Sequence, residues 1–146
     1  MSEQLRRLTD RVYASPQIGL VDVAEAARAG FGMIVNNRPE DESDDQTPGA
    51  EIAAAAAAAG LGYVAIPVTH AGFSQPQIAA MAAALASTDA PILAYCRSGT
   101  RSTLLWALAE ASGGTSPHSL AASASQAGYD LTPIRAMLDM LAAQDR

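Results

Sequence analysis

Short apolar runs that alternate with helix-forming stretches place the strongest constraint on how this chain folds. The runs are nearly continuous in apolar residues, which is typical of strands buried on both faces. The predicted strands are 31–36, 61–68, 91–96 and, with a weaker signal, 11–14. The predicted helices between them are 20–29, 48–59 and 75–86. This alternation predicts an α/β fold in three layers, with a central, mostly parallel sheet of four to five strands flanked by helices.

Helix start and stop signals support these boundaries. Thr47 and Pro48 suit the N-cap and first turn of the second helix, and Gly60 suits a left-handed residue at its end. Ser74 and Gln77 have the spacing of a capping box at the start of the third helix. The second half of the chain is predicted to form a helical cover, with helices at about 102–111, 117–127 and 133–143.

The size and composition of the chain fit one globular domain covering residues 1–146. A chain of this length buries about two thirds of its unfolded surface, which is enough for a core without disulfides. Its 49% hydrophobic and 16% charged residues are ordinary, and its apolar runs are too short to span a bilayer. We therefore expect no membrane insertion. Residues 1–10 lack the apolar stretch of a secretory signal, which predicts a cytoplasmic location.

The charged residues argue against a nucleic-acid partner. All nine basic residues are arginines, and they are scattered along a chain of net charge −6. A nucleic-acid site would need a basic stripe, which the sequence does not contain. The acidic segment 39–45 is interpreted as a solvated loop; a carboxylate metal site is the alternative, but no complementary ligand is nearby. Neither a metal nor an organic cofactor is expected.

The single cysteine, Cys96, excludes an intramolecular disulfide, a Cys-x-x-Cys redox pair and a thiolate-rich zinc site. Its sulfur stands at the carboxyl end of a predicted strand, and a predicted helix begins six residues later. Ligands bind at this edge of parallel sheets. Backbone N–H groups of a tight loop and the dipole of the next helix attract negative charge. We therefore expect Cys96 to be held as a nucleophilic thiolate.

The loop after the cysteine suits the binding of an anion. Its expected members are Arg97, Ser98, Gly99 and Thr100. Gly99 leaves the amides unblocked and can adopt a positive φ. Arg101 offers a planar fork of N–H donors to an anion, and Ser102 could donate its hydroxyl to the thiolate or cap the next helix. The alternative is an inert, buried cysteine followed by an ordinary turn.

Two residues outside this loop are further candidates for the site. His70 follows a predicted strand at the same edge as Cys96, where it could act as an acid, a base or a substrate contact. The alternative is an ordinary loop histidine. Arg38 also ends a predicted strand at this edge. It could add a second positive charge for an anionic substrate, although a salt bridge to the acidic loop is the preferred interpretation.

The segment CRSGTRS, residues 96–102, resembles the active-site loop of rhodanese-like sulfurtransferases. It is also similar to the Cys-x5-Arg-Ser loop of tyrosine and dual-specificity phosphatases. With IVNNRP at 34–39 and YVAIPV at 63–68, it makes residues 17–105 resemble a bacterial phosphatase-like family. That family is found alone or fused to beta-lactamase-like hydrolase domains acting in sulfide metabolism. The resemblance implies a tyrosine-phosphatase-like α/β fold that carries a cysteine-dependent site.

Two departures from the phosphatase pattern bear on the chemistry. Only the four residues 97–100 separate Cys96 from Arg101, as in the sulfurtransferase loop, whereas phosphatases have one more. A shorter loop makes a smaller ring of amides, which suits the outer sulfur of a persulfide better than a phosphoryl group. The resembling phosphatases also use an aspartic acid in the loop before the cysteine strand. Residues 69–74 contain no carboxylate, which leaves only His70 as an acid.

The sequence supports three hypotheses about activity, and each has a small anionic ligand. The leading one is a cysteine-dependent sulfurtransferase that takes sulfane sulfur from thiosulfate or a persulfide and holds it as a Cys96 persulfide. The second is a phosphatase that hydrolyses a phosphate ester through a Cys96 phosphoenzyme, with Arg101 clamping the phosphate. The third is an anion-binding module without turnover. The oligomeric state is left open.

Overall fold

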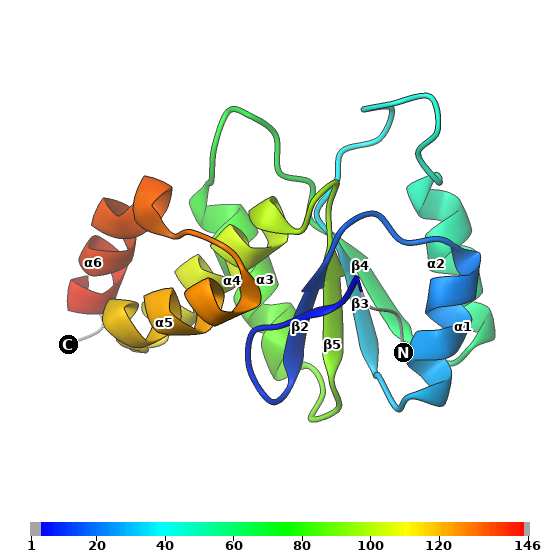
Figure 1. Cartoon of the computed structure of the whole chain (residues 1–146), viewed down its shortest axis with the longest axis horizontal. Helices are drawn as coiled ribbons and strands as arrows, with labels where there is room; N and C mark the ends of the chain where they lie inside the picture. Colours follow the sequence, from blue (N-terminus) through cyan, green and yellow to red (C-terminus); the bar gives the residue numbers. More distant parts are fainter. Residues whose placement is uncertain (1–3, 145–146) are drawn as a thin grey trace.

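The strands form one sheet between two layers of helices (Figure 1). A computed structural model describes residues 4–144 of the chain. The strands are β1 (Arg6–Arg7), β2 (Val12–Ser15), β3 (Met33–Asn36), β4 (Gly62–Ala65) and β5 (Ile92–Tyr95). Their order across the sheet is β1-β2-β5-β3-β4, and all neighbours are parallel except β1 and β2. The predicted three-layer α/β fold is confirmed; the short β1 was not predicted.

The helices are divided between the two faces of the sheet. They are α1 (Leu20–Arg28), α2 (Gly49–Ala58), α3 (Gln75–Ala86), α4 (Thr100–Ser112), α5 (Pro117–Ala127) and α6 (Arg135–Gln144). The first two lie on one face, and the other four lie on the opposite face, with α4 packed against α3, α5 and α6 (Figure 1). The second half of the chain is therefore the predicted helical cover. No helix within residues 4–144 is long and apolar enough to cross a membrane.

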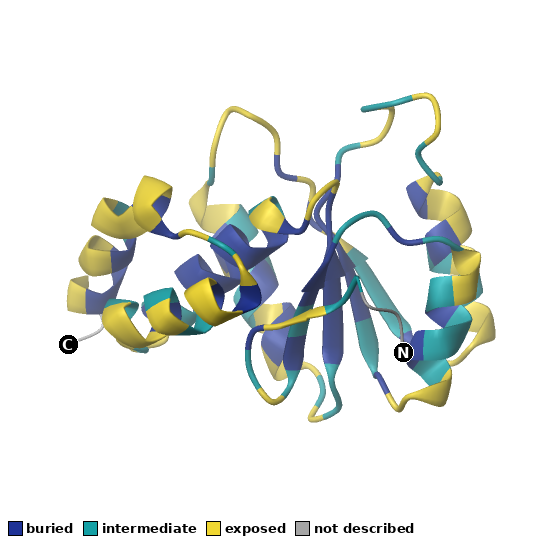
Figure 2. Ribbon diagram, viewed as in Figure 1, coloured by how far each residue is buried: buried dark blue, intermediate teal, exposed yellow. Residues whose placement is uncertain are grey.

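The core is built on both faces of the central strand β5, whose four residues are all buried (Figure 2). Ile92 and Ala94 face the cluster formed with the α3 and α4 side, while Leu93 and Tyr95 face the α1 and α2 side. Burial on both faces is thus confirmed for β5. It is wrong for β4, an edge strand with no fully buried residue. An edge strand has a neighbour on one side only, which leaves its side chains less covered.

Most of the predicted helix ends agree with the structure. Gly60 follows α2 with a φ of 82°, and the Ser74 side chain accepts a hydrogen bond from the Gln77 N–H in a capping box. The prediction for Thr47 is wrong by one residue, because Pro48 stands at the N-cap position of α2. The start of α4 lies two residues earlier than predicted, and Gly99 is its N-cap with a φ of 91°. This places the cysteine loop directly against the helix start.

Candidate active site

The carboxyl ends of the four parallel strands converge at one edge of the sheet. Cys96 follows β5, Gln17 lies two residues after β2, Arg38 lies two residues after β3, and Val68 lies beyond the end of β4. Arg101 joins them from the first turn of α4. Parallel strands bring these positions together although they are far apart in the sequence, and this edge is where α/β sheets bind ligands.

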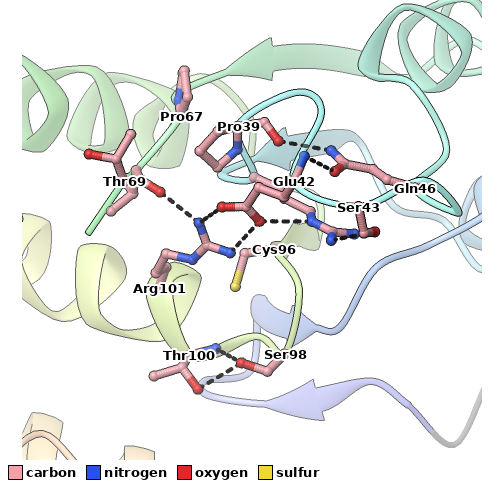
Figure 3. A network of polar contacts seen from close by, with 12 residues as sticks. Pro39, Glu42, Ser43, Gln46, Pro67, Thr69, Cys96, Ser98, Thr100 and Arg101 are labelled. Atoms are coloured by element: carbon pink, nitrogen blue, oxygen red, sulfur yellow. Dashed lines mark hydrogen bonds and ion pairs between the residues drawn. The ribbon is translucent and has the colours of Figure 1, made fainter. Parts of the chain in front are cut away.

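Cys96 is completely buried, but its sulfur has polar neighbours. The Gly99 N–H donates a hydrogen bond to the Cys96 Sγ at 3.1 Å. The sulfur also lies near the Arg101 guanidinium, and Cys96 is one of the groups that raise the pKa of Arg101, after Glu42. Figure 3 shows the Cys96 side chain between Arg101 and the segment of Ser98 and Thr100. A thiolate at this position would face a backbone donor and a positive charge.

Most of the other predicted loop residues expose their side chains. Arg97, Ser98 and Thr100 are exposed, whereas Gly99 is buried. The Ser98 hydroxyl donates to the Thr100 Oγ1 at 3.0 Å, which joins these two side chains to each other. Arg97 does not add a buried positive charge to the site. The loop residues therefore stay candidates for binding an anion through their N–H groups.

Arg101 is the predicted anion-binding arginine, and a carboxylate of the protein already holds it. Its Nη1 and Nη2 donate to the two oxygens of Glu42 at 2.7 and 2.8 Å. Nη1 also donates to the Val68 carbonyl at 2.8 Å. Figure 3 shows the Arg101 guanidinium facing the Glu42 carboxylate. Such a two-point contact fixes the plane of the guanidinium group. The Nε–H and the second Nη2 hydrogen are not used by these bonds, and the guanidinium also faces the Cys96 sulfur.

Arg38 is buried and contacts the same carboxylate. Its Nε donates to Glu42 Oε1 at 2.9 Å, its Nη1 to the Gln17 side-chain carbonyl at 3.0 Å, and its Nη2 to the Ser43 hydroxyl at 3.1 Å. The preferred interpretation, a salt bridge to the acidic loop, is confirmed. Because Glu42 contacts both arginines, Arg38 also belongs to the network around Arg101.

The interpretation of the acidic segment as a solvated loop is wrong for Glu42. Its side chain is 19% exposed, and its hydrogen bonds to Arg101 and then Arg38 lower its pKa from the usual 4.5 to about 2, against the opposing effect of burial. The carboxylate therefore stays charged at neutral pH. Within residues 4–144, no group of three or more His, Cys, Asp or Glu side chains is arranged to hold a metal ion.

Two predicted site residues lack the contacts expected of them. Ser102 is fully buried, but its hydroxyl has no hydrogen-bond partner in the part of the chain that the structure describes. It neither donates to Cys96 nor caps α4, because Gly99 occupies the N-cap position. His70 is exposed in the turn after β4, two residues beyond the Val68 carbonyl that contacts Arg101. His70 therefore follows β4 at the sheet edge where Cys96 lies, but it makes no hydrogen bond to the sulfur.

Three residues that contact the cysteine loop or its arginines were not singled out from the sequence. Glu42 lies four residues after Arg38, and this spacing within an acidic run was a usable signal. Gln17 and Tyr129 have no such local signal. Tyr129 follows α5, and its hydroxyl donates to the Ser98 carbonyl at 3.1 Å across a separation of 31 residues. Contacts of this range depend on the tertiary fold.

Comparisons with known proteins place the chain in a described family. Residues 4–113 match the family described as "Beta-lactamase hydrolase-like protein, phosphatase-like domain". A beta-lactamase hydrolase-like protein of Xylella fastidiosa is 35% identical over 103 residues, which is 70% of this chain and 24% of the relative. A protein of the same name from Agrobacterium fabrum is 32% identical over 105 residues, again 24% of its length. The chain therefore spans about a quarter of these relatives.

Solved structures show the same fold over the whole chain. The phosphatase candidate nma1982 of Neisseria meningitidis superposes with a TM-score of 0.82 and 30% identity, covering 96% of this chain and 99% of that one. Tk-PTP in its active form superposes with a TM-score of 0.76 at 18% identity, covering 99% of each chain, which shows the fold alone. The chain belongs to the phosphatase-like domain family of beta-lactamase hydrolase-like proteins.

Proposed function

We propose that this domain is a cysteine-dependent phosphatase that hydrolyses phosphate monoesters. The observation that carries the proposal is the position of the Cys96 sulfur, which accepts the Gly99 N–H at 3.1 Å and lies beside Arg101 at the start of α4. Membership of a phosphatase-like family supports it. The comparisons thus favour phosphatase chemistry over the sulfur transfer that was the leading hypothesis from the sequence.

The proposed reaction has two steps, each at the Cys96 sulfur. In the first, the thiolate attacks phosphorus, an S–P bond forms, and the bond from phosphorus to the ester oxygen breaks. The leaving oxygen takes a proton from an acid or from water. In the second step, water attacks the phosphocysteine, the S–P bond breaks, and inorganic phosphate and the thiolate are released. No redox change occurs.

Charge stabilisation would come from the loop amides and from Arg101. The guanidinium is held by Glu42 and by the Val68 carbonyl, so it cannot follow a moving substrate. A donor that is fixed before the substrate arrives stabilises the transition state without the cost of reorganisation. Glu42 therefore orients the arginine, while the Nε–H and the remaining Nη2–H are offered to the phosphoryl oxygens.

The supply of a proton to the leaving group is the weak part of the site. The segment 69–74 has no carboxylate, and His70 is its only candidate for the proton donor to the leaving group. We expect aryl phosphates with acidic phenols to be hydrolysed well and esters of basic alcohols poorly. If His70 is the acid, His70→Asn slows the hydrolysis of phenyl phosphate more than that of p-nitrophenyl phosphate. His118→Asn, at an exposed position of α5, changes neither rate.

Sulfur transfer is kept as a second candidate because of one observation. Only residues 97–100 separate Cys96 from Arg101, which is the spacing of the sulfurtransferase loop that the segment resembles. Such a step would move the outer sulfur of thiosulfate to the thiolate and release sulfite, giving a persulfide on Cys96. A nucleophilic acceptor such as cyanide would then remove that sulfur and regenerate the thiolate.

Steady-state assays on the purified protein separate the candidates. Hydrolysis of p-nitrophenyl phosphate that is abolished in Cys96→Ser is the expected result. Ser98→Ala is the matched control, because this exposed loop hydroxyl is not the proposed nucleophile. Phosphatase activity that survives in Cys96→Ser would contradict the proposal. Transfer from thiosulfate to cyanide without any ester hydrolysis would replace it with the second candidate.

A further inference from the structure

Tyr129 reaches the cysteine loop from a distant part of the chain. It follows α5, whose C-cap Gly128 has a φ of 96°, and its own N–H donates to the Ala124 carbonyl at 2.8 Å. The helix end therefore fixes the Tyr129 backbone next to the cysteine loop. Its hydroxyl donates to the Ser98 carbonyl at 3.1 Å.

The peptide group between Ser98 and Gly99 consequently has both of its polar ends engaged. Its carbonyl accepts from the Tyr129 hydroxyl, and its N–H donates to the Cys96 sulfur at 3.1 Å. In a planar trans peptide the C=O and N–H bonds point in opposite directions. A donor that holds the carbonyl on one side therefore aims the N–H at the sulfur on the other.

The Ser98–Gly99 peptide group can rotate easily, so a contact from outside the loop is needed to hold its orientation. Gly99 has a φ of 91° and no side chain, so rotation of the adjoining peptide groups meets little steric resistance. The neighbouring carbonyls have backbone donors: the Arg97 carbonyl accepts from the Gln17 N–H at 3.3 Å, and the Gly99 carbonyl from the Thr103 N–H at 3.0 Å. The Ser98 carbonyl instead depends on a side-chain hydroxyl from beyond α5.

We propose that Tyr129 is a positioning residue for the candidate nucleophile, because its hydroxyl holds the Ser98–Gly99 peptide with the Gly99 N–H facing the Cys96 sulfur. The inference rests on the proposed function only in taking Cys96 as the reactive group. Without the hydroxyl, the peptide can rotate and turn its carbonyl towards the sulfur. That rotation would replace an attractive dipole with a repulsive one and disfavour the thiolate.

The surroundings of Tyr129 keep its hydroxyl protonated, so that it remains a hydrogen-bond donor. Burial raises the pKa of Tyr129, and the nearby Cys96 raises it further, whereas Arg6 opposes both effects. The phenol therefore keeps its proton at neutral pH. Contact is also close, since a Cβ added at residue 99 would overlap the Tyr129 hydroxyl and lie 3.1 Å from its Cζ. A side chain at residue 99 would therefore displace the Tyr129 ring.

The test is the Tyr129→Phe substitution, which removes the hydroxyl and keeps the ring. Cys96 is the only cysteine, so the ultraviolet absorbance of its thiolate can be titrated directly, with Cys96→Ser as the background. We expect the titration midpoint to rise by roughly half to one pH unit in Tyr129→Phe, as the loss of one hydrogen bond predicts. Tyr13→Phe, on the opposite face where Tyr13 packs against Phe31, should leave the midpoint unchanged.

A second measurement tests the same inference through the peptide itself. Hydrogen exchange at the Gly99 amide should accelerate in Tyr129→Phe while the amides of β5 keep their protection, which also shows that the variant is folded. An unchanged midpoint with unchanged exchange at Gly99 would overturn the positioning role. If ester hydrolysis is absent from the wild type but the midpoint still shifts, the proposed function fails and the role of Tyr129 stands.

Discussion

The cysteine loop, residues 96–101, and the acidic loop, residues 37–46, leave neighbouring strands at the same sheet edge, but different contacts hold them. The Cys96 sulfur accepts an N–H from a residue three positions away. The Arg101 side chain is held by Glu42, which is 59 positions away in the sequence. The direct donor to the sulfur is therefore local, whereas the direction of the guanidinium group depends on the assembled fold.

The largest effect should come from changing Arg101. Arg101→Lys keeps the positive charge but loses the planar fork that Glu42 grips at 2.7 and 2.8 Å. We expect kcat/KM for p-nitrophenyl phosphate to fall by about 10³-fold, as for loss of a fixed transition-state donor. Arg97→Lys, on the exposed part of the same loop, should change it less than about threefold. Equal losses in the two variants would show that charge alone matters.

Gly99→Ala changes the cysteine loop itself. The added Cβ would overlap the Tyr129 hydroxyl and lie 3.3 Å from the Ser15 carbonyl carbon, at a φ of 91°. We expect a loss of about 1–3 kcal/mol in the free energy of unfolding and about 100-fold in kcat/KM. Gly30→Ala is the matched control, with the same φ of 91° but open space around the new Cβ. If Gly30→Ala costs as much activity, the contact with Tyr129 is irrelevant.

Glu42→Gln changes the contact by which the acidic loop holds Arg101. The change removes the charge that both arginines face, so Arg101 keeps a hydrogen-bond acceptor but loses its ionic partner. We expect the free energy of unfolding to fall by about 2 kcal/mol, and kcat/KM by about tenfold. Asp139→Asn breaks an ion pair of the same i,i+4 spacing whose side chains are 45% and 60% exposed, and should cost less than about 0.5 kcal/mol.

Measurements of Glu42→Gln have a clear contrary outcome. If its stability matches that of Asp139→Asn in chemical denaturation, the network of Glu42 with Arg38 and Arg101 does not stabilise the fold. If stability falls but kcat/KM does not, the carboxylate is structural and does not orient the guanidinium group for catalysis.

The last prediction concerns how the stability of the fold depends on acid. The pKa of Glu42 is lowered from 4.5 to about 2 in the fold, so its contribution is complete above pH 4.5 and is lost as the pH falls towards 2. Over this interval the wild type should lose more unfolding free energy than Glu42→Gln, by at most roughly 3 kcal/mol. Parallel curves for the two proteins, from denaturant titrations at each pH, would contradict this assignment.

The sequence predicted the parts of the molecule that local patterns determine. Apolar runs located β2, β3, β4 and β5, and the capping box of Ser74 and Gln77 located the start of α3. It also placed Cys96 at a strand-to-helix turn. It did not predict that β4 lies at the sheet edge, because the order of strands is set by crossovers and packing. The apolar pattern of an edge strand can equal that of a central one.

In the candidate site, too, the residues of one short segment were predicted and their distant partners were not. Cys96, Gly99 and Arg101 were identified because their spacing along one short segment is typical of an anion-binding cysteine loop. The partners of Arg101 and of the Ser98 carbonyl, Glu42 and Tyr129, come from segments brought close only by the sheet and by α5. Ser102 does not cap α4, because the helix begins two residues before it and Gly99 is the N-cap.

Whether Cys96 is a covalent nucleophile for phosphate esters is tested most directly by rapid quenching in acid during turnover of p-nitrophenyl phosphate, followed by intact-protein mass spectrometry. The predicted result is a transient gain of one phosphoryl group in the wild type, mapped to the peptide that contains Cys96, with no such gain in Cys96→Ser. Steady ester hydrolysis with no phosphorylated Cys96 at any quench time, or a phosphoryl group on another residue, would contradict the assignment.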